Sequence, residues 1–286
     1  MSSIIDDMTT NDRDYVLGTH DEEIERLGLQ HNVWRPRAMA AWQRAGFTVG
    51  QTLIDVGCGP GYATLDLAEL VGPRGHIVAV DRSRRFLDAL DTRRRARGFD
   101  NVSIVEADLD VATFDEFSAD GAWCRWVTAF VPRPRELLER VARGLKPGAR
   151  FVLHEYFDYA TWRAMPRSPV FEAFVEATIA NWRRSGGEPD IALDIPAWLE
   201  ALGFEIQSLT PIVDVISSRD YVWQWPKTFV KIGVQRLIEL GAIDETKGAQ
   251  MESAFDEIDR SSSARMITPS VLEIIARKRR SSTATD

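Results

Sequence analysis

The sequence predicts an α/β protein built around a mostly parallel sheet that helices cover on both faces. Residues 51–157 alternate short apolar runs of strand length with segments of helical periodicity. A glycine-rich turn follows the first apolar run. The chain has 286 residues, 44% of them hydrophobic, which is enough to bury a sizeable core. Because strands that alternate with helices need crossover connections, we expect them to align in parallel.

The first predicted element is a helical cover over residues 1–48. Apolar residues recur at helical spacing between residues 21 and 47, and Gly28 and Pro36 interrupt this spacing. We therefore expect two helices in this segment, followed by the main domain over residues 49–286.

Within the main domain, the predicted elements alternate in order. The expected strands are 52–57, 76–81, 101–108, 121–127 and 150–157, and the helices between them begin near residue 62, at residue 83 and at residue 133. The later segments are expected to be helical at 161–190 and 195–204, extended at 205–216 and mostly helical at 219–260, with a last strand at the start of 264–278. Helical insertions at about 158–198 and 218–262 are therefore expected to form a lid over the sheet edge.

The turn after the first strand is the strongest candidate for a ligand site. Gly57, Gly59 and Gly61 occupy every second position between a strand ending at Val56 and a helix beginning near Tyr62. Glycine permits positive φ and lets a ligand approach backbone amides. A turn without a ligand and a dinucleotide-binding loop are the alternatives. The dinucleotide fingerprint needs glycine at its sixth position, where this chain has Tyr62.

Acidic residues follow the next two strands. Asp81 ends the second strand, where a carboxylate can accept hydrogen bonds from both hydroxyls of a ribose. Asp108 ends the third strand, and Leu109 is available to pack on a base. Three strand ends therefore converge on one nucleoside-shaped ligand.

At these residues the chain resembles the class I S-adenosylmethionine-dependent methyltransferases. The resemblance covers about residues 50–157, through the motif Asp55–Gly61, Asp81, Asp108 and the segment "LKPGARFVL". It implies a Rossmann-like, doubly wound, seven-stranded sheet with an antiparallel last strand. It also implies S-adenosyl-L-methionine as the cofactor, with Asp55 and the loop glycines around the methionyl part, Asp81 on the ribose and Asp108 near the adenine.

A weaker resemblance extends to segments 15–31 and 186–204, which look like bacterial small-molecule methyltransferases near the ubiquinone/menaquinone group. It implies that Arg26 faces the carboxylate of the cofactor, although a surface position is the alternative for such an arginine. The further cofactor contacts predicted with it are Tyr15, Gln30, Cys58, Arg82, Leu109, Arg125 and Trp126.

Methyl transfer needs an acceptor held in line with the sulfur–methyl bond, and a base only where the acceptor is a hydroxyl. The candidate catalytic residues are His31, His154, Glu155 and Tyr156. Alternation along the fifth strand puts Glu155 on one face and His154 with Tyr156 on the other, so a structural role is the alternative for each. No metal is expected.

Charge and composition limit the classes of partner and acceptor that the sequence favours. A net charge of -8 disfavours binding to nucleic acid or anionic membranes, and two cysteines without a long apolar run favour the cytoplasm. The segment "CRWVTAF" after the fourth strand lacks the Asn/Asp-Pro-Pro-aromatic motif of amino-methylating nucleic-acid enzymes, and neither cysteine follows a proline. We therefore expect a small-molecule acceptor, and the oligomeric state stays open, with a homodimer as one option. A protein or RNA methyltransferase and a non-catalytic S-adenosylmethionine-binding protein are the alternatives.

Overall fold

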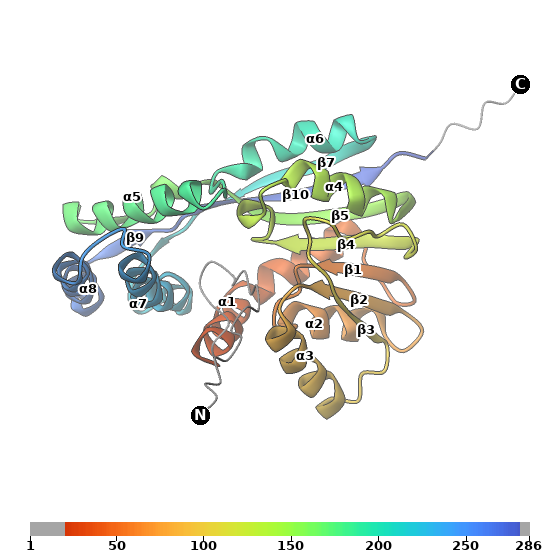
Figure 1. Cartoon of the computed structure of the whole chain (residues 1–286), viewed down its shortest axis with the longest axis horizontal. Coiled ribbons are helices and arrows are strands. Elements are labelled where there is room, and N and C mark those ends of the chain that lie inside the picture. Colours follow the sequence, from red (N-terminus) through yellow and green to blue (C-terminus); the bar gives the residue numbers. More distant parts are fainter. Residues whose placement is uncertain (1–20, 281–286) are drawn as a thin grey trace, which may run out of the picture.

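A seven-stranded sheet organises the part of the chain that the computed structural model describes, residues 21–280 (Figure 1). Its strand order is β3-β2-β1-β4-β5-β10-β7. The strands are β1 (Thr52–Val56), β2 (His76–Asp81), β3 (Val102–Glu106), β4 (Ala119–Arg125), β5 (Leu145–Asp158), β7 (Phe204–Ile212) and β10 (Ser270–Lys278). The first five pair in parallel, whereas β10 is antiparallel to both β5 and β7. The predicted mostly parallel sheet with an antiparallel last strand is confirmed.

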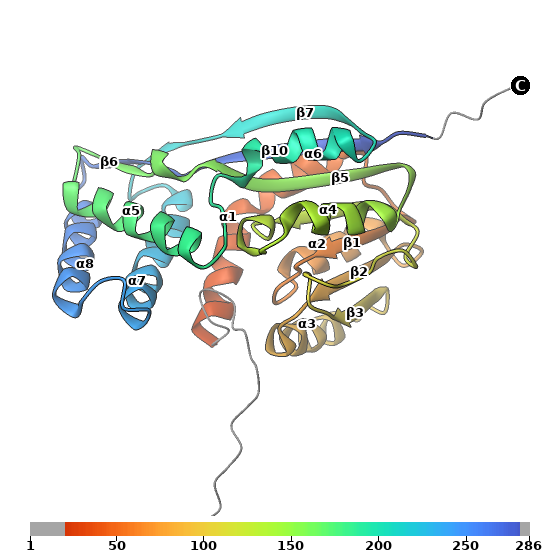
Figure 2. The same ribbon diagram turned by 45° about the horizontal axis from the view of Figure 1, so that its top comes forward.

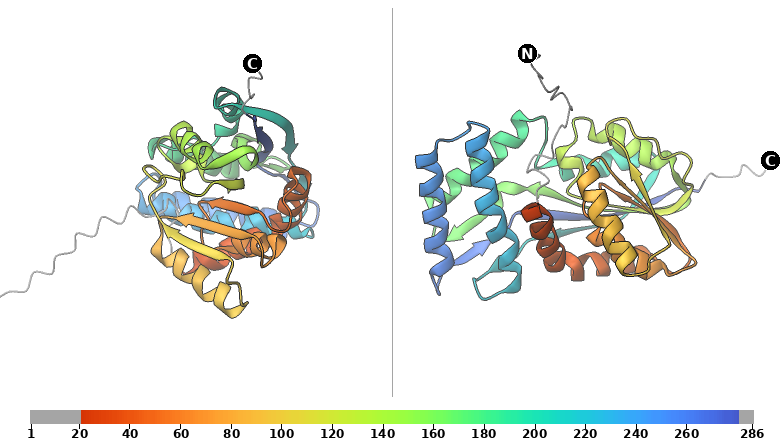
Figure 3. Two further views of the ribbon diagram at one scale, coloured as in Figure 1. Left: turned by 90° about the vertical axis from the view of Figure 1, so that its right-hand side faces the viewer. Right: turned by 60° about the horizontal axis from the view of Figure 1, so that its bottom comes forward.

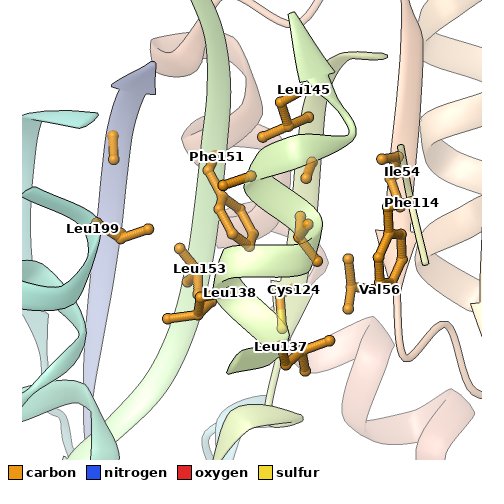
Figure 4. Packing of buried hydrophobic residues seen from close by; sticks show 14 of the residues in the cluster. Ile54, Val56, Phe114, Cys124, Leu137, Leu138, Leu145, Phe151, Leu153 and Leu199 are labelled. Carbon is orange, nitrogen blue, oxygen red and sulfur yellow. The ribbon is translucent and has the colours of Figure 1, made fainter. Parts of the chain in front are cut away.

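Helices cover both faces of this sheet (Figure 2). They are α2 (Tyr62–Val71), α3 (Arg84–Ala96), α4 (Pro134–Arg143) and α6 (Ile195–Ala201). Because successive strand residues point to opposite faces, Ile54 packs on the side of α4 and Leu53 on the side of α2. Figure 4 shows Leu138 of α4 beside Leu153 of β5 and Leu137 of α4 near Cys124 of β4. The apolar runs of the sequence are therefore buried on both sides, as expected for parallel strands.

The N-terminal segment forms one helix, α1 (Asp21–Ala45), so the prediction of two helices is wrong. Gly28 does not interrupt it. A Cβ atom at that position would lie 2.6 Å from the ring of Tyr62, so the absence of a side chain lets α1 pack closely against α2. Pro36 lies inside the helix between Trp34 and Trp42, both fully buried. Burial of these large side chains outweighs the local cost of the proline.

A second layer lies beyond the carboxyl ends of the parallel strands and contains the helices α5 (Pro169–Arg184), α7 (Gln224–Glu239) and α8 (Glu245–Arg260). A three-stranded sheet joins them, with strands β6 (Arg163–Met165), β9 (Arg265–Ile267) and β8 (Val215–Ile216). We call this layer the lid. Figure 3 shows α1 between the lid helices and the main sheet, and α1 contacts both α7 and α2.

Two expectations for this region need correction. The last long strand begins at Ser270, while the start of segment 264–278 forms the short strand β9. Residues 162–168 are not helical, because β6 precedes α5. Short 3₁₀ helices complete the description at Thr128–Phe130, Tyr159–Thr161, Ile191–Leu193 and Tyr221–Trp223. Between residues 21 and 280, the structure contains no helix with the length and apolar character that a bilayer crossing requires.

Candidate functional site

A pocket of about 160 Å³ lies at the carboxyl ends of β1, β2 and β4, beneath α1. We call it the strand-end pocket. The structure brings together these predicted residues in its wall: Gln30, His31, Asp55, Gly57, Cys58, Gly59, Asp81, Arg82, Asp108, Leu109, Arg125 and Trp126. Tyr15 lies outside the described residues. Sequence patterns did not single out Leu27, Ser83, Phe86 or Trp123, which also line the pocket. Nothing in their spacing distinguishes them from ordinary core residues.

The glycine loop is shaped by close packing on both sides. Gly57 and Gly61 have φ of 67° and 82°, a region that other residues rarely adopt. A Cβ atom at Gly57 would lie 2.4 Å from Val127, and one at Gly61 would lie 2.2 Å from Leu90. In contrast, open space surrounds the corresponding position at Gly59, which lines the pocket. Gly61 itself precedes α2 and is not part of the pocket wall.

The amides of the Gly57–Gly61 loop are already paired, which corrects the expectation that a ligand rests on free amides. Those of residues 57 and 58 both donate to the carbonyl oxygen of Val80, at 2.8 and 3.0 Å. Gly59 donates to Oδ2 of Asp81 at 2.8 Å, and the amide of residue 61 donates to the carbonyl oxygen of residue 58 at 3.1 Å. The glycines therefore provide room and turn geometry for a ligand rather than hydrogen-bond donors.

Four carboxyl groups line the pocket wall, those of Asp55, Asp81, Asp108 and Asp110. Asp81 accepts the amide of Gly59 on one oxygen and that of Ser83 on the other, and each oxygen keeps a further lone pair. Asp108 accepts the amide of Asp110 at 2.9 Å. Asp55 is 2% exposed, and its burial raises its pKa to about 6, although Thr64 donates a hydrogen bond to it at 2.6 Å. Asp55, Asp81 and Asp108 therefore each accept at least one hydrogen bond from within the protein.

Four side chains form a hydrogen-bonded series from the surface to the pocket. Arg35 donates to Asp66 at 2.7 Å, and the Nε2 atom of His31 lies 3.0 Å from the same oxygen. Nη2 of Arg125 lies 3.2 Å from Nδ1 of His31. Because a guanidinium only donates, Nδ1 of His31 accepts this bond and Nε2 carries the proton toward Asp66. Burial lowers the pKa of His31, which keeps the ring neutral. Its lone pair is thus occupied by Arg125.

The two predicted arginines differ in their surroundings. Arg26 binds Glu23 through two hydrogen bonds of 2.7 and 2.6 Å and also donates to Gln30. Its charge is therefore compensated within α1. Arg125 lies over the rings of Trp123 and Trp126, and its Nη1 atom is excluded from solvent without a hydrogen-bond partner. Burial lowers the pKa of Arg125 to about 10, so it is still a cation at neutral pH.

His154 and Glu155 do not line the pocket, so their location does not suit a direct role in chemistry. His154 is fully buried between Trp34 and Trp123, with Nε2 3.2 Å from Glu273. Oε1 of Glu155, also fully buried, accepts the amides of residues 127 and 128, both at 2.9 Å. The alternation of β5 gives the face of each residue correctly, but α1 and the turn after β4 cover both faces at this point.

Tyr156 lines a second, smaller pocket of about 30 Å³, which also contains Arg26. We call it the aromatic pocket. Its aromatic residues are Trp126, Phe130, Tyr156, Tyr159, Trp162, Trp182, Trp225 and Phe229. Trp126 stacks between Tyr156 and Trp225, with ring centroids at 5.4 and 5.5 Å. Gln30, Trp126 and Phe130 line both pockets, so the two are adjacent. Within residues 21–280, no group of three or more His, Cys, Asp or Glu side chains is arranged to hold a metal ion.

Comparisons with known proteins agree with this architecture. A family model described as a methyltransferase domain matches residues 47–184. The demethylmenaquinone methyltransferase of Lactococcus lactis is 27% identical over 152 residues, which cover 53% of this chain and 56% of that protein. The ubiquinone/menaquinone biosynthesis C-methyltransferase UbiE of Brucella canis is 30% identical over 149 residues, which cover 48% of this chain and 55% of that protein. The chain thus spans about half the length of these curated relatives.

Solved structures share the fold over most of the chain. Geranyl diphosphate C-methyltransferase of Streptomyces coelicolor, solved with Mg²⁺, geranyl-S-thiolodiphosphate and S-adenosyl-L-homocysteine, aligns with a TM-score of 0.54 and 17% identity, over 85% of this chain and 76% of its own. At this identity the likeness concerns the fold. The family match, the sequence relatives and the sheet order together identify residues 47–184 as a class I S-adenosylmethionine-dependent methyltransferase domain near the ubiquinone/menaquinone C-methyltransferase group.

Proposed function

We propose that the protein transfers the methyl group of S-adenosylmethionine to a small molecule. The observation that carries this proposal is the adjacency of the two pockets: the strand-end pocket suits a nucleoside with an amino-acid tail, and it shares Trp126 with the aromatic pocket. A cofactor in the first pocket would then present its methyl group toward an acceptor in the second.

The side chains of the strand-end pocket fit the nucleoside part of this cofactor. Asp81 keeps one lone pair on each oxygen for the two ribose hydroxyls, because its backbone partners use only one. Leu109 and Phe86 supply apolar surface for the base, and Asp108 lies beside them in the wall. The open space at Gly59 lets the ligand approach the backbone closely.

The contribution of the protein to the reaction is positioning and exclusion of water. Bound S-adenosylmethionine would supply a methyl group already activated by a positively charged sulfur. The aromatic rings around Trp126 would exclude water from the acceptor, and their π faces would favour a nearby cation. His31 has no lone pair left to act as a base, because Arg125 uses it. Of the four catalytic candidates, Tyr156 alone belongs to the acceptor side, since it lines the aromatic pocket.

A small acceptor is favoured over a macromolecule. The aromatic pocket, with a volume of about 30 Å³ and walls from α1, β5 and the lid, is too small for a peptide or a nucleotide chain. The net charge of -8 acts against a polyanionic partner. The name of the sequence relative UbiE, a ubiquinone/menaquinone biosynthesis C-methyltransferase, also favours a small acceptor.

Calorimetry with S-adenosylhomocysteine tests the cofactor. Asp81→Ala removes the ribose acceptor and is expected to weaken binding at least about 10-fold, since hydrogen bonds to a charged group contribute roughly 1.5–3 kcal/mol. Asp88→Ala, which removes an exposed carboxylate on α3, is the matched control and should bind as the unmodified protein does. Equal affinity in the Asp81 and Asp88 variants would contradict the assignment.

Incubation with methyl-labelled cofactor and a fractionated cell extract tests the acceptor. We expect label in a small-molecule fraction. Label only in protein or RNA would contradict a small acceptor. Tight binding without transfer to any fraction would favour a non-catalytic binding protein.

A further inference from the structure

We infer that the methyl acceptor is a cationic, amphipathic small molecule, and that most of it binds in a groove on the outer side of the aromatic pocket. This groove has a volume of about 870 Å³ and lies between α1, α7 and α8, where α7 contacts both other helices (Figure 3). We call it the outer groove. The inference rests on the proposed function, because it names the class of acceptor and the site that holds its body.

The size of the aromatic pocket requires a second space for the acceptor. Its volume is about 30 Å³, which gives room for roughly two water-sized groups. Clefts that hold small-molecule ligands measure about 300–1,000 Å³, and the outer groove falls within this range. The group that receives the methyl therefore fits in the aromatic pocket, and the body of the acceptor lies in the adjoining groove.

A row of side chains on α1 connects the cavities. Glu23 lines the outer groove, Arg26 lines both the groove and the aromatic pocket, and Gln30 lines the aromatic and strand-end pockets. Arg26 donates hydrogen bonds to both of its neighbours in this row. On α7, Phe229 lines the aromatic pocket and the next residue, Val230, lines the groove. The outer groove thus adjoins the acceptor side of the reaction.

The side chain of Arg26 is the partition between the outer groove and the aromatic pocket. It lies in the walls of these two cavities and not in that of the strand-end pocket, which argues against the sequence-based expectation that it faces the carboxylate of the cofactor. An arginine side chain has several rotatable bonds. A change of its rotamer joins the two spaces without a shift of the helix.

The outer groove combines an apolar floor with a charged rim. Leu29, Val230 and Phe255 line it, and the last two are buried. Exposed charged side chains from all three helices surround this floor, among them Glu25, Lys231 and Glu252. An apolar body would gain from contact with the floor, and a charged group of the same molecule would lie at the rim.

The rim carries a negative charge. Among the described residues of the wall, three of the four cations are in ion pairs, namely Arg26 with Glu23, Lys227 with Asp259 and Arg236 with Glu239. The other charged groups of this wall are Lys231 and the exposed carboxylates of Glu22, Glu25, Glu252 and Asp256. Four negative charges against one positive charge attract a cation and repel phosphate or carboxylate groups.

The aromatic pocket is compatible with the same class of ligand. Trp126 and Trp225 stack with their ring centroids 5.5 Å apart, and the π faces of such rings favour a cation. The charge of Arg26 is offset by Glu23. An alkylamine, which is protonated at neutral pH, therefore satisfies both the rim of the groove and the aromatic walls.

Three naphthalene probes test the charge preference, with S-adenosylhomocysteine present to fill the strand-end pocket. They are naphthylmethylamine, which is a cation, naphthylmethanol, which is neutral, and naphthylacetate, which is an anion. In calorimetry at low ionic strength, the amine should bind at least about 5-fold more tightly than the acetate, with the alcohol between them.

Variants of the rim test the origin of this preference. Glu25→Gln combined with Glu252→Gln should reduce the ratio of the amine and acetate affinities to about 2-fold, because it removes two of the four carboxylates. Glu200→Gln combined with Glu257→Gln is the matched control. It removes two exposed carboxylates outside the groove wall and should keep the ratio of the native protein.

Chemical modification of the groove tests its part in turnover. Lys231→Cys places a thiol at an exposed position of the groove, whereas Cys58 and Cys124 are buried. A bulky maleimide on this thiol should abolish binding of the amine probe and lower label transfer about 10-fold or more, with S-adenosylhomocysteine affinity within about 2-fold. Lys247→Cys, exposed on α8 outside the groove wall, is modified in the same way as the control.

Several results would overturn the inference. They are equal affinities for the amine and acetate probes, an unchanged ratio in the Glu25 and Glu252 variant, and label transfer that survives the maleimide. Slow reaction of the thiol introduced at position 231, relative to that at position 247, would show that another segment or a second copy of the chain covers the groove. Absence of label transfer by the unmodified protein would instead overturn the proposed function, and the probe affinities, which need no turnover, would decide separately whether the groove binds cations.

Discussion

Glu155 shows how a residue with the right chemistry for catalysis can serve the fold instead. Its carboxyl group is fully buried, and it accepts the amides of Val127 and Thr128 at the start of a 3₁₀ turn. Trp126 lies directly before these two residues and has a positive φ of 52°, an uncommon conformation for tryptophan. The carboxyl group therefore helps to hold the residue that both pockets share.

Burial raises the pKa of Glu155 to about 7, which predicts a pH-dependent effect of Glu155→Gln. Above the ordinary pKa of a glutamate, the unfolded chain ionises while the folded carboxyl stays protonated, so native stability falls as pH rises toward 7. Glutamine does not titrate. The unfolding free energy of Glu155→Gln, relative to that of the native protein, should therefore increase between pH 4.5 and pH 7. The total increase should be about 3 kcal/mol at pH 8.

Denaturant unfolding at pH 5 and pH 8 measures this gain. Glu257→Gln, which removes one carboxylate at an exposed position on α8, is the matched control. A stability difference for Glu155→Gln that is the same at both pH values would argue against a protonated carboxyl in the folded protein.

Single residues were predictable where one strand decides their position. The alternation of the fifth strand gives the opposite faces of His154 and Glu155, and the strand ends give Asp81 and Asp108. Whether such a side chain is open to a ligand was not predictable, because the groups that cover it come from distant parts of the chain. Glu273, the partner of His154, lies 119 residues further along.

At the scale of elements, the unit β1–loop–α2 separates its glycines into two functions. Gly61 is packed against Leu90 of α3, whereas open space surrounds the Cβ position of Gly59. In the sequence motif both positions are glycine, so the motif does not distinguish their two roles. Only the approach of α3 to the loop distinguishes them, and sequence periodicity does not report how closely two helices pack.

This difference predicts two kinds of variant. Gly61→Ala should lower the unfolding free energy by about 2–4 kcal/mol, since it combines overpacking with a left-handed backbone. Gly59→Ala should cost only about 1 kcal/mol, for its positive φ, but it should weaken S-adenosylhomocysteine because its methyl group enters the pocket. Thermal unfolding and calorimetry on both variants provide the measurement. A Gly61→Ala protein as stable as Gly59→Ala would refute the packing argument.

At the scale of the whole molecule, the main sheet was predictable and the lid was not. Residues 51–157 carry regular alternation, which predicts the parallel strands. The lid sheet joins strands of two or three residues from segments around residues 164, 216 and 266. Strands this short carry no periodicity, so their pairing is set by tertiary packing. For the same reason, the sequence did not predict that several lid tryptophans line one pocket.

The division between the sheet and the lid predicts separable effects on binding and turnover. Trp225 belongs to α7 and lines the aromatic pocket but not the strand-end pocket. Trp225→Ala should reduce the rate of label transfer about 10-fold or more, and leave S-adenosylhomocysteine affinity within about 2-fold. Trp223→Phe, on a buried lid residue outside both pockets, is the control. A parallel loss of cofactor affinity in Trp225→Ala would show that the lid belongs to the cofactor site.

The pairing of β5 with β10 has a mechanical consequence for entry of substrate. β5 has 14 residues, and its ladder with β10 extends to Asp158, beside the aromatic side chains of Tyr156 and Tyr159. β7 pairs with the other edge of β10 as far as Val271, so one stiff three-stranded ribbon runs from the central sheet into the base of the lid. A hinge across it would break main-chain hydrogen bonds, so the wall of the aromatic pocket must yield at its helices and side chains rather than swing away as a rigid flap.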